Sequence, residues 1–127
     1  MIKEGMLTNT KDERWIHQML SKVIRPRGYE QIRANAEGYE LPAALSRKDG
    51  EIAYIPDATA VLHGRKCYFE LALKTERVRE VASKWKLMSM LAAAREGQFF
   101  IVAPRGHVAF AEKILKQHHI LAAVVRI

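Results

Sequence analysis

Hydrophobic positions near the start of the chain recur with the period of a helix. They are Trp15, Ile16, Met19, Leu20, Val23 and Ile24. This spacing predicts an amphipathic first helix. Thr10 is placed to cap this helix, with Glu13 three residues later as the partner of a capping box. The segment Arg25-Pro26-Arg27-Gly28 then ends the helix.

The pattern then changes to one that is typical of strands. A polar strand is predicted over residues 29–41, a second strand over 52–62 and a third, largely apolar strand over 66–74. Asp49-Gly50 is a hairpin signal between the first two strands. A tight turn at His63-Gly64-Arg65 joins the second and third strands, so we expect these two to pair as a hairpin.

The second half of the chain alternates between helix and strand. A long helix is predicted over residues 76–96, and the apolar segment 98–103 is typical of a buried central strand. A helix over 108–118 and a last strand over 120–127 complete an α/β fold with the order α-β-β-β-α-β-α-β. We expect the long helix to pack on the third strand through an apolar stripe, with Val81 and Trp85 buried. The stripe consists of Val78, Val81, Trp85, Met88 and Ala92.

Length and composition indicate a single domain spanning residues 1–127. Hydrophobic residues make up 49% of the chain, which argues against disorder. The apolar stretches are too short to cross a membrane, and the first residues lack the apolar core of a signal peptide. The single cysteine, Cys67, cannot form an internal disulfide. We expect it to be a small buried residue in a reducing compartment, which indicates a cytoplasmic location.

Charge adds a preference for polyanionic partners. Lysine and arginine number 21 against 14 aspartate and glutamate, which gives a net charge of +7. Nucleic acid is the commonest polyanion that a protein of this kind meets. The alternative is that the basic residues of the long helix form a solvated face with snorkelling side chains. Candidate phosphate contacts on that helix and in the first hairpin turn are Arg77, Arg79, Lys84, Lys86, Arg47 and Lys48.

Two carboxylates stand in segments that otherwise read as buried strands. Asp57 follows Ile55-Pro56, and Glu70 interrupts an apolar run in the third strand. If the turn is His63-Gly64, Asp57 lies directly opposite Glu70, and if it is Gly64-Arg65 the two become diagonal neighbours. Both registers place them on one face of the sheet. Burial of two like charges is costly, and a divalent cation held by oxygen ligands would compensate it.

The third strand has two faces of different character. Cys67, Phe69, Leu71 and Leu73 form the face that we expect to be core, while the other face carries Glu70 and Lys74. With a metal at the pair, Asp57→Asn is expected to abolish divalent binding and to raise metal-free stability by relieving repulsion. The alternative is that Asp57 is a turn or bulge residue beside Pro56 and that Glu70 pairs with a nearby lysine or arginine.

Ile55-Pro56-Asp57, Glu70 and the order of the elements around them resemble the PD-(D/E)xK nuclease superfamily. This resemblance implies a restriction-endonuclease-like core, which is a mixed β-sheet flanked by helices. It also implies Mg²⁺ or Mn²⁺ ligands at Asp57 and Glu70. The superfamily often adds an acid from the first helix, for which Glu13 is the candidate, although the capping box offers Glu13 a different role.

The usual pattern of this superfamily has a lysine two residues after the third-strand acid, where this chain has Ala72. Lys74 is on the same face, on the order of 13 Å from Glu70 between α-carbons, and is the displaced candidate for the catalytic lysine. Alternatively Lys84 or Lys86 of the following helix reaches in. The segment 70–76 also resembles the replication-relaxation proteins of plasmids and mobile elements, which share this broad fold.

Three hypotheses follow from these patterns. The first is a DNA-binding protein of the PD-(D/E)xK fold that cleaves phosphodiester bonds with Mg²⁺, as a homodimer when both strands are cut. The second is a catalytically inactive DNA-binding or assembly module of the same fold, from a plasmid, phage or mobile element. The third is a small basic α/β protein whose partner is another protein. Ala72 is the residue that separates the first two hypotheses.

Overall fold

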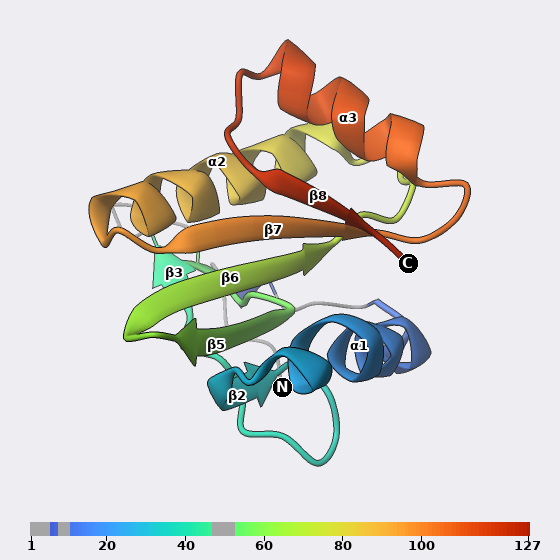
Figure 1. Ribbon diagram of the computed structural model, residues 1–127. Coiled ribbons are helices and arrows are strands. Elements are labelled where there is room, and N and C mark those ends of the chain that lie inside the picture. Colours follow the sequence, from blue (N-terminus) through green and yellow to red (C-terminus); the bar gives the residue numbers. More distant parts are fainter. Residues whose placement is uncertain (1–5, 8–10, 47–52) are drawn as a thin grey trace.

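The computed structural model describes residues 6–7, 11–46 and 53–127. Its centre is a five-stranded mixed sheet with the order β2-β5-β6-β7-β8 (Figure 1). The first three of these strands are antiparallel, and β6, β7 and β8 are parallel to one another. The strands are β2 (Glu30–Ala34), β5 (Ala58–Leu62), β6 (Arg65–Leu71), β7 (Gln98–Ala103) and β8 (Ala123–Arg126).

Helices cover both faces of this sheet. The first helical segment lies against one face and comprises α1 (Glu13–Met19), a π-helical turn (Leu20–Ile24) and a 3₁₀ turn (Arg25–Arg27). The other face is covered by α2 (Val78–Ala94) and α3 (Val108–Gln117), as Figure 1 shows. Within the described ranges, no helix is long and apolar enough to cross a membrane.

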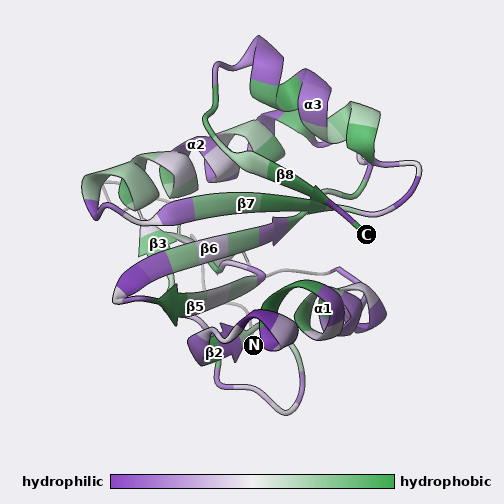
Figure 2. Ribbon diagram, in the orientation of Figure 1, coloured by the Kyte–Doolittle hydropathy of each residue, from purple (hydrophilic) through white to green (hydrophobic). Residues whose placement is uncertain are grey.

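The sheet has a core on each side, so the expectation that only one face of β6 is buried is wrong. Cys67, Phe69 and Leu71 pack against the first helical segment. Tyr68 and Ala72 pack on the opposite side, together with residues of α2 and α3. Figure 2 shows hydrophobic residues dominating β7 and β8, as expected for strands covered by helices. The face that carries Glu70 is therefore an interior.

The contact between α2 and the sheet follows the predicted stripe. Trp85 is 1% exposed and lies in the core on the α2 side of the sheet, as expected. Val81 is only half-buried, since it lies at the margin of the same core. The free thiol of Cys67 is buried, as predicted. The predicted strand over 98–103 and the predicted helix over 108–118 are confirmed to within one residue.

The hairpin between β5 and β6 has the first of the two predicted registers. His63 and Gly64 form its turn, with φ of 52° and 76°. Positive φ at both central residues is typical of the turn that matches the twist of a two-residue hairpin. Leu62 then pairs with Arg65 and Ala58 with Phe69. Continuing this register by one residue places Asp57 opposite Glu70.

The segment predicted as one strand over residues 52–62 is divided. Its first part is β4 (Ala53–Tyr54), which belongs to a small second sheet with the order β1-β4-β3. That sheet contains β3 (Leu45–Ser46) and β1 (Met6–Leu7), which the pattern of residues does not predict. Ile55-Pro56-Asp57 lies between β4 and β5 and passes from one sheet to the other. Proline lacks the N–H that a central strand donates, which is consistent with a break at this point.

The start of the first helix differs from the prediction. Asp12 is the N-cap, and its side chain accepts a hydrogen bond of 2.9 Å from the Arg14 N–H. Glu13 is therefore the first helical residue and cannot be the capping-box partner of Thr10. Thr10 and the predicted turn at Asp49-Gly50 lie outside the described residues. The strand predicted over 29–41 is confirmed only for Glu30–Ala34.

Candidate functional site

Asp57 and Glu70 are held together by backbone hydrogen bonds on both sides. The Asp57 N–H donates to Glu70 Oε2 at 2.7 Å, and the Leu71 N–H donates to Asp57 Oδ2 at 2.8 Å. Both side chains are fully buried. The two-residue turn sets this juxtaposition, because it fixes the register of the hairpin. The backbone thus determines where the two carboxylates point.

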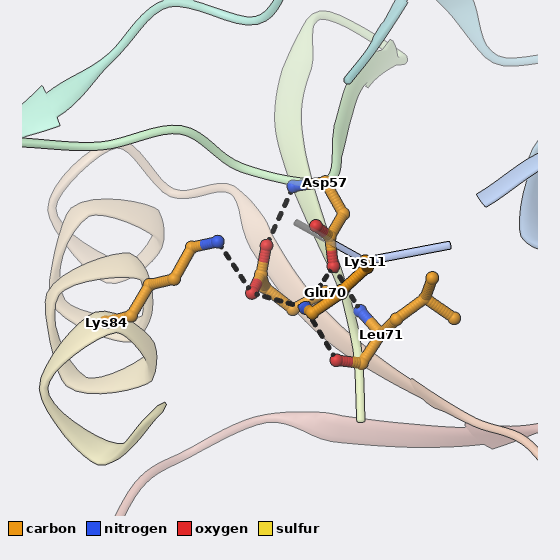
Figure 3. Close-up of polar contacts among 5 residues, drawn as sticks. All are labelled: Lys11, Asp57, Glu70, Leu71 and Lys84. Carbon is orange, nitrogen blue, oxygen red and sulfur yellow. Dashed lines mark hydrogen bonds and ion pairs between the residues drawn. The ribbon is translucent and has the colours of Figure 1, made fainter. Parts of the chain in front are cut away.

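Two lysines from different parts of the chain neutralise this pair. Figure 3 shows Asp57 and Glu70 between Lys11 on one side and Lys84 of α2 on the other. Lys11 Nζ lies 2.5 Å from Asp57 Oδ2 and 3.4 Å from Glu70 Oε1. Lys84 Nζ lies 3.1 Å from Glu70 Oε1. Two ammonium groups therefore balance two buried carboxylates.

The environment shifts the pKa of two of these groups. Burial raises the pKa of the Glu70 carboxyl, and the neighbouring Asp57 charge raises it further, while Lys11 and Lys84 act in the opposite direction. Burial alone would lower the pKa of the Lys11 ammonium, but the charges of Asp57 and Glu70 outweigh it, so this pKa is raised. Lys11 is accordingly charged when both carboxylates are ionised.

Three oxygens converge on one point of the site. They are Asp57 Oδ2, Glu70 Oε1 and the Leu71 carbonyl oxygen, and all three face Lys11 Nζ. The ammonium donates to the Leu71 carbonyl oxygen at 2.9 Å. Asp57 Oδ1 is buried and has no hydrogen-bond partner within the described part of the chain. Carboxylate and backbone carbonyl oxygens are the ligands that hard divalent cations prefer. The donor set therefore fits Mg²⁺ or Mn²⁺, with water completing the coordination.

Within residues 6–7, 11–46 and 53–127, the structure does not bring a third acidic side chain to this point. Glu13 is exposed, and its Oε1 accepts a hydrogen bond of 2.6 Å from the Glu37 N–H. Among the described residues, no group of three histidine, cysteine, aspartate or glutamate side chains is placed to hold a metal. The predicted ligand role of Glu13 therefore has no support in the geometry, and the Leu71 carbonyl provides the third oxygen instead.

Lys84, and not Lys74, is the lysine that reaches the carboxylates from beyond β6. Because β6 ends at Leu71, Lys74 lies beyond the end of the strand and is exposed. The backbone N–H of Lys74 donates a hydrogen bond of 2.9 Å to His107 Nδ1. Lys84 points inward, with its side chain 13% exposed. Of the two helix lysines that the sequence offers, Lys84 reaches Glu70 and Lys86 is exposed. The alternative in which Asp57 is a turn or bulge residue and Glu70 pairs with a lysine agrees with the structure in that Asp57 lies in a bend and Lys84 contacts Glu70.

Lys11 is the residue of this site that the sequence pattern did not indicate. It precedes the first helix by two residues and is 46 residues from Asp57 and 59 from Glu70 along the chain. Its position follows no period of helix or strand. The one available signal was the pair itself, because two buried acids require positive charge from somewhere.

The residues predicted to contact phosphate lie in different environments. Arg77, Arg79 and Lys86 are exposed, and Arg77 forms a loose pair with Glu80 at 3.7 Å. Lys84 lies instead inside the site, so it is not a surface contact. Arg47 and Lys48 lie outside the described residues. Arg79 is five residues before Lys84 and Lys86 is two residues after it, so the helical period places both on the side of α2 that faces away from Lys84.

No family model, curated protein or solved structure matches this chain. Three oxygens of the site face the ammonium of Lys11, and a second ammonium, that of Lys84, lies beside them. Such groups suit chemistry on a phosphate, because a metal held by oxygens polarises the phosphate and fixed positive charge stabilises the charge that develops.

Proposed function

We propose that this chain is a DNA-binding protein of the restriction-endonuclease-like fold that cleaves phosphodiester bonds with Mg²⁺ or Mn²⁺. The observation that carries the proposal is the convergence of Asp57, Glu70 and the Leu71 carbonyl on one cation position, with Lys84 beside it. The fold supports it, since three antiparallel strands are followed by a long helix and a parallel strand. This is the element order that the resemblance to the PD-(D/E)xK superfamily implies.

Each residue of the site has a distinct role in this proposal. Asp57, Glu70 and the Leu71 carbonyl would hold the metal. When bound, the metal supplies a Lewis acid for the phosphate and lowers the pKa of a coordinated water. Lys84 would stabilise the negative charge that develops on the phosphate. Ala72 cannot take this role, because it is fully buried in the core against α2.

The direct test is cleavage of DNA by the unmodified chain. We expect nicking of duplex or branched DNA in the presence of Mg²⁺ or Mn²⁺, and none when a chelator removes the metal. Gel assays over a range of protein concentrations also test whether cutting of both strands requires a homodimer. If no DNA form is cut with either metal, the nuclease proposal is wrong.

DNA binding is expected to depend on the exposed basic residues of α2. Replacement of Arg77, Arg79 and Lys86 with alanine should weaken binding and reduce the slope of log affinity against log salt by roughly three, or about one per lost phosphate contact. Fluorescence anisotropy at several salt concentrations measures both quantities. The matched control removes three exposed charges near α3, at Arg105, Lys113 and Lys116. Equal losses in both variants would indicate general charge attraction without a defined interface.

A second function is favoured by a specific observation. Lys11 contacts the oxygens that a metal would bind. In addition, Ala72 stands where the PD-(D/E)xK pattern has its lysine. Both features suit an inactive DNA-binding or assembly module. Salt-sensitive DNA binding without cleavage would support it. Ala72→Lys is a poor test of lost activity, because a lysine there would be buried beside Trp85 and destabilise the fold.

A further inference from the structure

Lys11 lies where a bound cation would lie. Its ammonium contacts Asp57 Oδ2 at 2.5 Å, the Leu71 carbonyl oxygen at 2.9 Å and Glu70 Oε1 at 3.4 Å. We infer that Lys11 and a divalent cation compete for these three oxygens, so that Lys11 is a built-in inhibitor of metal binding. This inference rests on the metal site of the proposed function.

Simultaneous occupation is excluded by geometry. Mg²⁺ binds oxygen at about 2.0–2.1 Å, and each of the three oxygens already faces the Lys11 ammonium at hydrogen-bonding or ion-pair distance. A metal on the same three donors would therefore lie close to the position that Nζ holds, too close for both to be present. The lysine must leave before the metal can enter.

Charge leads to the same conclusion. The two carboxylates are already balanced by Lys11 and Lys84, so a divalent ion added to all four would leave a buried excess of positive charge. Displacement of one ammonium reduces this excess from two charges to one. Lys84 contacts one of the three oxygens, Glu70 Oε1, from the side of α2, whereas Lys11 contacts all three. Lys11 is therefore the group that the metal replaces, and Lys84 can remain.

Calorimetric titration with Mn²⁺ alone tests the competition on the full chain. Lys11→Met keeps the length of the side chain and removes its charge. Lys22→Met is the matched control, because Lys22 is an exposed lysine of the helical segment that follows Lys11. Lys11→Met is expected to bind Mn²⁺ at least about tenfold more tightly than the wild type, since one charged competitor is worth roughly a factor of ten or more. Lys22→Met should bind as the wild type does.

A second measurement uses the wild type and does not depend on the folding of a variant. An amine-acetylating reagent with mass-spectrometric readout reports how accessible each lysine is. Mn²⁺ is expected to raise the labelling rate of Lys11 several-fold, because displacement frees its ammonium from three oxygens. The rates at Lys22 and Lys84 should not change.

The outcomes separate this inference from the proposed function. Equal Mn²⁺ affinity in Lys11→Met and wild type, with unchanged labelling of Lys11, would overturn the inference and leave the metal site intact. Loss of Mn²⁺ binding in Lys11→Met would also overturn it, because Lys11 would then assist the metal. Absence of binding in a folded Lys11→Met and in the wild type would refute the metal site, and the competition with it.

Discussion

Asp57→Asn is expected to lower the free energy of unfolding by about 3 kcal/mol, because removal of one partner from a buried ion pair leaves the other without its counter-charge. This reverses the expectation from the sequence, in which two carboxylates repel each other and the substitution relieves them. The structure provides the reason for the reversal. Lys11 and Lys84 already neutralise the pair, so asparagine would leave an excess buried positive charge. Urea denaturation of the metal-free protein measures the effect.

Two further variants make this prediction specific. Glu80→Gln removes a carboxylate from an exposed and loose pair with Arg77, and it should cost less than about 1 kcal/mol. The double variant Asp57→Asn with Lys11→Met should be destabilised by less than the sum of the single variants, since both partners of one contact are removed together. An Asp57→Asn protein as stable as the wild type would show that the pairing of Asp57 with lysine adds no net stability, and a more stable one would show that repulsion between the carboxylates outweighs it.

The parts of the fold that local patterns determine could be predicted from the sequence. The register of Asp57 against Glu70 follows from a two-residue turn and the period of a strand, and the structure has that register. The central strand β7 was predicted with the bounds it has. These features depend on residues that are near one another in the chain, so no knowledge of the packing was required.

The features that the sequence did not predict depend on contacts between segments that are distant in the chain. The pattern of β6 showed one apolar and one mixed face, but it could not show that α2 would cover the mixed face and bury Glu70. Lys11 was missed because its contacts with the pair cross 46 and 59 residues. Thr10 and Asp12 are both good helix caps by residue type, so the choice of Asp12 was not decided by the sequence.

Lys84→Ala is expected to reduce the rate of DNA cleavage by about 10²- to 10³-fold, which is the usual effect of removing one group that stabilises developing charge. Lys84 is largely buried, contacts Glu70 Oε1 at 3.1 Å and comes from the helix that also carries the exposed basic residues. In the proposed function, Lys84 would stabilise charge on a phosphate bound at the metal. Single-turnover cleavage with Mg²⁺ measures the rate, and Lys116→Ala on α3 is the control for loss of one exposed charge.

Binding measurements distinguish this role from a structural one. DNA affinity should be largely retained in Lys84→Ala, because Lys84 lies inside the site and the exposed contacts remain. Its stability will also fall, since Glu70 loses one of its two lysines, so cleavage must be measured at a temperature where circular dichroism shows a folded protein. Lys84→Arg keeps the charge and should recover part of the rate. Reduced stability with unchanged cleavage in Lys84→Ala would show that Lys84 only balances the charge of Glu70.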